Sequence, residues 1–170
     1  MYRFKRVRDD RDMDLWLKLR TAVYLASGFL TQSDVNDAGI YVDQYDAYSE
    51  HVLAVDDTGL VVGSARLIVR QNGEPLQVEK EFNITVEAVS AEISGLAVVA
   101  ARRGSAVTAG LVRAVLEIAR EGKIDRVYAE VEDDFLRHLN RFGFPLAPMT
   151  ETRFVFNTFN RVATASVDNF

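Results

Sequence analysis

The sequence predicts an α/β (α+β) fold in which helices flank a central sheet of mixed parallel and antiparallel strands. Three stretches carry this prediction: a hairpin over residues 50–70, a strand-helix-strand unit over residues 91–131, and an N-terminal helix. A hairpin adds antiparallel strands, whereas two strands joined through a helix tend to pair in parallel. The expected order of elements is therefore strand, helix, hairpin, strand, helix, strand, helix and strand.

The N-terminal part of the chain combines a strand, a helix and a hairpin. "YRFKRV" (2–7) alternates in polarity and favours a strand. Apolar side chains then recur at helical spacing, at Leu15, Trp16, Leu19, Val23 and Ala26. Asp12 is the expected N-cap of this helix and Gly28 its end. Residues 28–47 lack periodicity and predict an ordered loop, and Gly59 provides the turn of the hairpin that follows.

The second half alternates strands with helices after an irregular stretch at 71–90. "AEISGLAVV" (91–99) is apolar enough for burial on both faces, which predicts a central strand. The later elements are expected as a helix from Ser105 to Glu121 that ends at Gly122, a strand at 126–131, a helix at 132–142 and a strand at 152–159. Residues 160–170 are expected to be a loose tail or a weakly docked strand.

Composition excludes several classes of function. The 170 residues have the length of one domain, and we expect 1–170 to form a single unit. A net charge of −5 without a basic run argues against a nucleic-acid partner. The chain has no cysteine and only two histidines, His51 and His138, so no metal centre is expected. We see no membrane span or leader and expect a cytoplasmic protein.

The loop after the central strand is a candidate phosphate site. The strand ends near Val99 and a helix starts near Gly104, so backbone N–H groups and the positive end of the helix dipole would converge there. Arg102 and Arg103 flank this point. Such a loop suits the pyrophosphate of coenzyme A or the phosphate of a phosphopantetheine. The alternative is an ordinary surface loop with two solvated arginines.

The element order and "VVAARRGSAVTAGLV" resemble the GNAT N-acyltransferase fold, whose pantetheine-binding loop reads Arg/Gln-x-x-Gly-x-Gly/Ala. Arg103 matches the first position, whereas Ala106 and Thr108 replace the small residues of the pattern. The resemblance implies a GNAT-like acyl-CoA N-acyltransferase fold. It also implies an acyl-donor site that comprises Val98, Arg102, Arg103, Gly104, Ser105 and Ala106.

A second resemblance covers about residues 15–145. "LRTAVYLASGFL", "DQYD", "VVGSARLI", "AEISGLAV" and "NRFGF" are similar to motifs of the acyl-homoserine-lactone synthases and of the related N-acyl amino acid synthases. Those enzymes use the same fold and usually take long acyl chains from acyl carrier protein. The resemblance implies substrate-binding roles for Arg20, Phe29, Asp43, Asp46 and Arg66, and places Glu92 at a critical position.

Two positions depart from the lactone synthases. Tyr41 stands where those enzymes have a glutamate before the D-x-x-D pair, and Gly95 stands where they have an arginine after the strand glutamate. Both losses remove charge on the acceptor side, which disfavours the sulfonium of S-adenosylmethionine. We expect Gly95 to leave free space where the lactone synthases have the arginine side chain. The stretches "SGFL" and "DQYDAYSEHVLAV" fit the N-acyl amino acid synthases better than the lactone synthases.

The residues of the central strand, from Glu92 to Val98, could provide the groups that N-acylation requires. A carboxylate must accept a proton from the amine, and burial should raise the pKa of Glu92 toward a useful range. Ser94 shares the strand face of Glu92 and is expected to provide a hydrogen bond. Backbone N–H groups from Gly95 and Leu96 to Val98 are expected to meet the oxyanion where the strand bulges. The alternative for Glu92 is a buried ion pair with Arg66 or Arg20.

Arg20 and Arg66 lie among apolar residues, and buried guanidinium groups require carboxylate partners. Asp43 and Asp46 in the irregular loop are the expected partners. Such pairs are either a clamp that closes the loop over substrate or a simple anchor for the loop.

The predicted function is transfer of a long-chain acyl group from acyl carrier protein or acyl-CoA to the amine of an amino acid or a similar small molecule. The co-substrate is phosphopantetheine or coenzyme A, without a permanently bound cofactor. A basic surface for the acidic carrier protein would be formed by Arg102, Arg103, Arg113, Arg120 and Lys123. The alternatives are a lactone synthase that uses S-adenosylmethionine, and a non-catalytic module that binds acyl chains or carrier protein.

Overall fold

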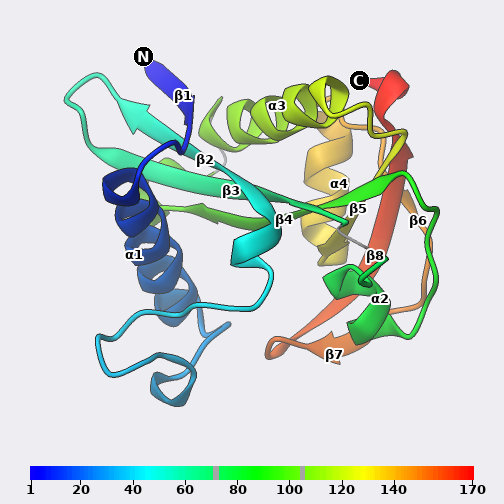
Figure 1. Cartoon of the computed structure of the whole chain (residues 1–170), viewed down its shortest axis with the longest axis horizontal. Helices are drawn as coiled ribbons and strands as arrows, with labels where there is room; N and C mark the ends of the chain where they lie inside the picture. Colours follow the sequence, from blue (N-terminus) through cyan, green and yellow to red (C-terminus); the bar gives the residue numbers. More distant parts are fainter. Residues whose placement is uncertain (71–72, 104–105) are drawn as a thin grey trace.

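The computed structural model describes residues 1–70, 73–103 and 106–170. One sheet runs through the molecule in the strand order β1-β2-β3-β4-β5-β8-β6, and β7 pairs with β8 (Figure 1). The strands are β1 (Tyr2–Arg6), β2 (Ser49–Asp56), β3 (Val61–Val69), β4 (Ser90–Val98), β5 (Arg126–Val131), β6 (Ala147–Pro148), β7 (Arg153–Val155) and β8 (Thr158–Ser166). β4 and β5 pair in parallel and their neighbours are antiparallel, so the predicted mixed sheet is confirmed.

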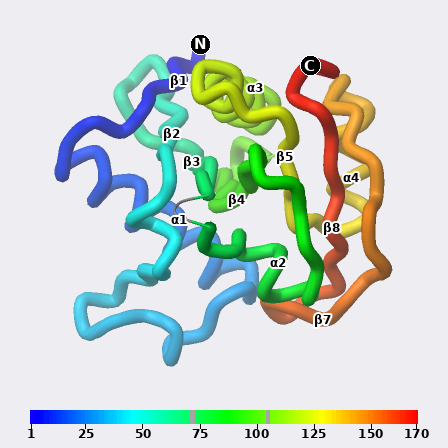
Figure 2. Tube along the Cα trace, turned by 45° about the vertical axis from the view of Figure 1, so that its right-hand side comes forward, coloured from blue at the N-terminus to red at the C-terminus, as the bar shows by residue number. Residues whose placement is uncertain are grey.

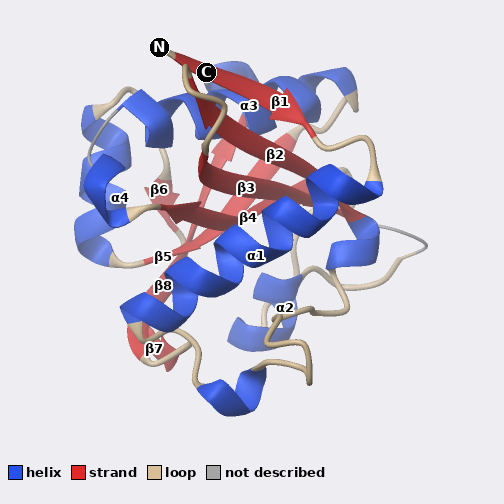
Figure 3. Ribbon diagram, turned by 90° about the vertical axis from the view of Figure 1, so that its left-hand side faces the viewer, coloured by secondary structure: helices blue, strands red, loops and turns tan. Residues whose placement is uncertain are grey.

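Helices cover both faces of the sheet (Figures 1 and 3). α1 (Asp10–Ser27) and α2 (Gln77–Phe82) pack on one face, while α3 (Ala106–Glu121) and α4 (Asp133–Arg141) pack on the other. Alternation along β2 explains the two layers, because Leu53 packs with Trp16 of α1 whereas Ala54 joins the core formed with α3. Within the described residues, no helix is long and apolar enough to cross a membrane.

The N-terminal helix begins earlier than expected. Its N-cap is Asp9, whose carboxylate accepts a hydrogen bond from the backbone N–H of Asp12 at 2.8 Å. Asp12 is not the cap because it lies inside the first turn, where Lys5 pairs with its carboxylate at 2.6 Å. The expected end is confirmed, since Gly28 has a left-handed backbone with φ of 78°.

The segment 71–90 is not wholly irregular, because α2 forms within it. The side chain of Glu79 accepts a hydrogen bond from the backbone N–H of Leu76 at 2.7 Å, and Asn83 ends the helix in a left-handed conformation. Six residues are too few to display a helical period in the sequence.

The structure corrects the expectation at 152–159 and selects the strand from the two alternatives at 160–170. A single strand at 152–159 was expected, but a turn at Phe156 and Asn157, both with positive φ, separates β7 from β8. Residues 160–170 are not a loose tail, because β8 pairs with β5 from Arg161↔Val131 to Ser166↔Arg126. In Figure 2 this red strand runs beside β5 as part of the sheet.

β4 and β5 separate halfway along their length, and this separation positions the site. Their parallel pairing ends at Ile93↔Ala129. On the other edge of β4, Arg66 pairs with Ser94 but Ser64 pairs with Ala97, so an extra residue bulges out of β4. Gly95 lies in this bulge with φ of +60°, a conformation that glycine adopts without strain.

Candidate active site

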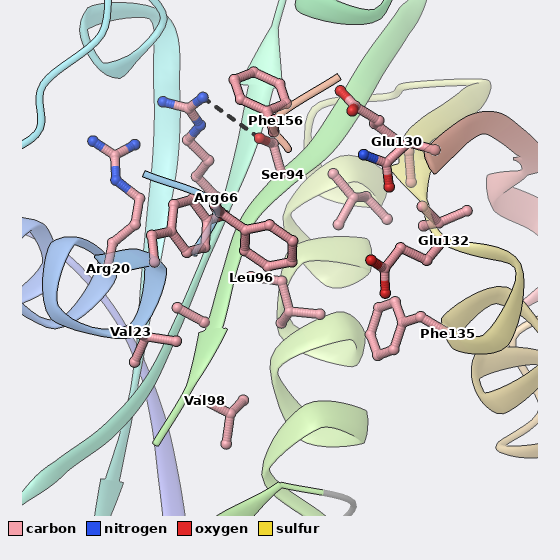
Figure 4. Close-up of a pocket in the computed structure, with 18 of the residues that line it drawn as sticks. Arg20, Val23, Arg66, Ser94, Leu96, Val98, Glu130, Glu132, Phe135 and Phe156 are labelled. Carbon is pink, nitrogen blue, oxygen red and sulfur yellow. Dashed lines mark hydrogen bonds between the residues drawn. The ribbon is translucent and has the colours of Figure 1, made fainter. Parts of the chain in front are cut away.

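A cavity of about 610 Å³ opens where β4 and β5 separate. Its wall on the α1 side contains the aromatic residues Tyr24, Phe29 and Tyr41, and its wall on the opposite face of the sheet contains Val112, Phe135 and Leu139. Figure 4 shows Arg20 and Arg66 on one side of this space and Glu130, Glu132 and Phe135 on the other. The cavity therefore connects a region of charged and aromatic side chains with an apolar region beside α3 and α4.

Four charged residues beside the cavity form one buried network. Arg66 donates to Asp43 and to Asp46, with Nη1–Oδ1 distances of 2.8 Å and 2.6 Å. Arg20 donates to Asp46, with Nη2–Oδ2 at 2.8 Å, and to the carbonyl oxygen of Tyr41 at 3.0 Å. The structure thus contains the predicted pairs between the arginines of α1 and β3 and the aspartates of the 28–47 loop.

The network is electrically balanced, with two guanidinium groups and two carboxylates. Burial opposes ionisation of Asp46, but His51, whose Nε2 lies 3.6 Å from Oδ1, and the hydrogen bonds from Arg20 outweigh it and hold the pKa of Asp46 well below its usual range. Burial likewise opposes the charge of Arg66, but Asp43 and Asp46 keep its pKa above the usual value. Arg66 therefore stays charged, with Asp43 and Asp46 as its counter-ions.

Glu92 of β4 lines the cavity and is 1 % exposed. Its Oε2 accepts a hydrogen bond from the backbone N–H of Val78 at 3.0 Å. Burial raises the pKa of Glu92 to about 8 in spite of that hydrogen bond and of the nearby charge of Arg66. The alternative of an ion pair with an arginine is wrong, because the guanidinium groups of Arg20 and Arg66 pair with the aspartates.

Ser94, Gly95 and Leu96 follow Glu92 along the cavity wall. The Oγ of Ser94 accepts a hydrogen bond from Nη2 of Arg66 at 3.4 Å. The expectation that Gly95 leaves free space was wrong. A Cβ at this position would lie 2.9 Å from the ring of Trp16 and 3.0 Å from Cγ of Arg66, so the volume is already filled.

The residues predicted to bind the acyl donor lie at the end of β4 and the start of α3. Val98 and Arg103 line the cavity, and Nε of Arg103 donates to the carbonyl oxygen of Val98 at 3.4 Å. Arg102 is exposed at the end of a short 3₁₀ turn, and Ala106 is the first residue of α3. Gly104 and Ser105 lie outside the described residues.

The sequence did not single out several residues that line the cavity. Glu130 and Glu132 come from the end of β5 and the residue after it, and Tyr24, Phe156 and Asn160 are further examples. Side chains alternate along β5, so Glu130 lies on the same face of the sheet as Tyr128. This alternation was the one sequence feature that could have identified Glu130 as a residue of the site. Among residues 1–70, 73–103 and 106–170, no group of three potential metal ligands is close enough to hold an ion.

Comparison of the sequence with models of known protein families identifies one family. The sequence model of the N-acyl amino acid synthase FeeM matches residues 16–155. Comparison with curated proteins by sequence finds no match.

Solved structures share the fold at low identity. The N-acyl amino acid synthase FeeM from uncultured soil microbes is 14 % identical with a TM-score of 0.77, over 99 % of this chain and 92 % of that one. The CoA-dependent acyl-homoserine lactone synthase BjaI, solved with MTA, is 22 % identical with a TM-score of 0.81, over 98 % and 84 % of the two chains. Escherichia coli ElaA is 18 % identical with a TM-score of 0.68, over 96 % and 99 %. The chain belongs to the N-acyl amino acid synthase FeeM family and is an N-acyltransferase of GNAT-like fold.

Proposed function

We propose that the protein transfers a long-chain acyl group from a phosphopantetheine thioester to the amino group of a neutral amino acid. The observation that carries this proposal is the single cavity in which the buried carboxylate of Glu92 meets an apolar region beside α3 and α4. Polar groups where β4 and β5 separate can contact the amine and the thioester, and the apolar region can hold the hydrocarbon chain of the acyl group.

The proposed reaction is a direct attack of the amine on the thioester. The amine nitrogen forms a bond to the carbonyl carbon, and Glu92 accepts a proton from that nitrogen. Backbone N–H groups of the bulge at Gly95 and Leu96 stabilise the oxyanion, and Ser94 adds a hydrogen bond. The C–S bond then breaks, the thiolate leaves with its electron pair, and it takes up the proton that Glu92 accepted, which returns Glu92 to its ionised form.

The acyl donor is proposed to enter past Arg103 and the start of α3. Coenzyme A and acyl carrier protein both present a phosphate before the pantetheine arm, so Arg102 and Arg103 serve either donor. We favour acyl carrier protein, because Arg113 and Arg120 are exposed on α3, the helix that begins beside Arg102 and Arg103, and can pair with acidic groups of a carrier protein although they alternate with Glu117 and Glu121. Because these donors are found in the cytoplasm, we also propose a cytoplasmic location, and we propose that residues 1–170 form one acyltransferase domain.

The proposed acceptor is neutral and amphipathic rather than S-adenosylmethionine. Tyr41 offers a ring that could attract a cation, but the guanidinium of Arg20 already lies 4.8 Å from the centre of that ring. Asp43 and Asp46 are neutralised by the two arginines and offer no free negative charge. The rings of Tyr24, Phe29 and Phe156 suit an apolar or aromatic side chain.

Mass spectrometry of lipid extracts from cells that overproduce the protein tests the proposal. We expect an N-acyl amino acid that is absent from cells producing Glu92→Gln. A lactone would support the lactone-synthase alternative, and no new product would support a module that only binds acyl chains or carrier protein.

A further inference from the structure

A second carboxylate, Glu130, faces the cavity without a fixed partner. It lies on β5, across the strand separation from Ser94 and Leu96 of β4 (Figure 4). It lines the same cavity as Glu92. Its Oε1 is buried and has no hydrogen-bond partner among the described residues. Glu92 differs, because its Oε2 is held by the backbone N–H of Val78.

Among residues 1–70, 73–103 and 106–170, no cation forms an ion pair with Glu130. The groups that influence it or respond to its charge are Glu92 on β4, Glu81 on α2, Tyr24 on α1 and Asn160 on β8. None of these four is a cation. Burial, followed by the charge of Glu81, raises the pKa of Glu130 to about 7. An unpaired carboxylate in a cavity is complementary to an incoming ammonium group.

N-acylation of an amine that arrives protonated removes two protons from its nitrogen in sequence. An amino group near neutral pH arrives as R–NH₃⁺ and finishes as an amide N–H, so it loses two protons. One proton ends on the thiol that leaves, and the other is released to solvent. Glu92 accepts one of these protons in the proposed function, and a carboxylate that binds the ammonium beforehand is suited to accept the other.

We propose that Glu130 is a second catalytic carboxylate, which binds the acceptor amine as its ammonium ion and accepts its first proton. An N–H bond of the ammonium breaks, the nitrogen keeps the electron pair, and the proton forms an O–H bond at Oε1 of Glu130. The free amine then attacks the thioester, and Glu92 accepts the next proton. Protonated Glu130 returns its proton to solvent after the product leaves. This inference rests on the proposed N-acyltransfer.

Binding of a simple ammonium ion tests the first half of this proposal without turnover. The probe is phenethylamine at neutral pH, titrated by calorimetry into the wild-type chain, Glu130→Gln and Glu87→Gln. Glu87 is a matched control, because it lies outside the cavity and pairs with Arg126 on the surface. We expect Glu130→Gln to weaken binding by roughly tenfold or more, since a charged hydrogen bond becomes neutral, and Glu87→Gln to bind as the wild type does. Equal binding by all three, or no binding to the wild type at millimolar probe, would overturn the proposal.

The pH dependence of turnover tests the second half and separates catalysis from a structural role. With decanoyl-carrier protein and L-phenylalanine, Glu130→Gln should lower kcat/KM by roughly 10²-fold near pH 7. The deficit should shrink above pH 9, because the amine then arrives already deprotonated. A deficit that stays constant with pH would indicate a structural effect and contradict the proposal, as would full activity at pH 7. If the wild type does not acylate L-phenylalanine, the proposed acceptor is wrong, while the calorimetry still decides whether Glu130 binds ammonium.

Discussion

Nη1 of Arg66 lies 2.6 Å from Oδ1 of Asp46, and both side chains are almost fully buried. This contact joins the central sheet to the loop at 28–47, which has little regular structure of its own. Asp46 also pairs with Arg20 of α1, so one carboxylate links three parts of the fold. Because that loop supplies Tyr41 and Asp43 to the cavity, the ion pairs determine the shape of the acceptor region.

Replacement of Asp46 by asparagine should destabilise the protein by about 3–5 kcal/mol at pH 7, since two buried guanidinium groups would share one carboxylate. The pKa of Asp46 is lowered on folding, so its contribution is present above an unfolded pKa near 3.9 and is lost as the pH falls below it. Urea denaturation at several pH values measures both effects. Asp14→Asn, which breaks a surface pair with Lys18, should change stability little. A loss for Asp46→Asn no larger than this control would contradict the account.

Glu92→Gln should lower turnover by roughly 10²- to 10⁴-fold, the usual scale for a lost proton acceptor. The same change should raise stability at pH 8. The pKa of Glu92 is about 8 in the folded state and about 4.5 in the unfolded state. Between these two pH values the folded state binds more protons, so the folded protein loses stability as the pH rises from about 4.5 to about 8. Steady-state kinetics and thermal unfolding at pH 6 and pH 8 measure the two effects. A stable and fully active variant would show that the proton acceptor lies elsewhere.

Arg102→Glu combined with Arg103→Glu should raise the KM for the acyl donor and leave the KM for the acceptor unchanged, because these residues lie at the end of β4 near the start of α3. Arg8→Glu with Arg11→Glu is the matched control, since it makes the same charge change at exposed positions of the N-terminal region. An unchanged donor KM at low salt in the first pair would exclude this loop as the donor site.

Gly95→Arg should destabilise the fold rather than restore the lactone-synthase pattern, even together with Tyr41→Glu. A side chain at Gly95 meets Trp16 and Arg66, and the positive φ adds backbone strain of about 1–3 kcal/mol. We expect a lowered melting temperature and no lactone from the double variant. Lactone production by a stable double variant would mean that only these two positions separate the activities.

Features that depend on local sequence patterns were predicted correctly, whereas features that depend on tertiary contacts were missed. The hairpin turn at Gly59, the helix end at Gly28 and the central position of β4 follow from local patterns, and all three are confirmed. The start of α1 was misplaced because two aspartates compete for the cap, and the carboxylate of Asp12 is instead engaged by a lysine on β1.

The candidate site was predictable only in part. The arginines stood out because a charged residue within an apolar helix or strand requires a partner. Glu130 did not stand out, because β5 reads as an ordinary strand and nothing in its sequence indicates that β4 separates from it. The filled space at Gly95 depends on Trp16, which is distant in sequence and contacts the glycine only in the folded chain.

The most direct test of the central claim is a competition between acceptors in one reaction. The purified protein is incubated with decanoyl-carrier protein, the twenty amino acids and S-adenosylmethionine, and the products are identified by mass spectrometry. We predict one or more N-decanoyl amino acids, no acyl-homoserine lactone, and no calorimetric binding of S-adenosylmethionine at millimolar concentration. A released lactone, or binding of S-adenosylmethionine tighter than about 100 μM, equivalent to roughly −5.5 kcal/mol, would contradict the account.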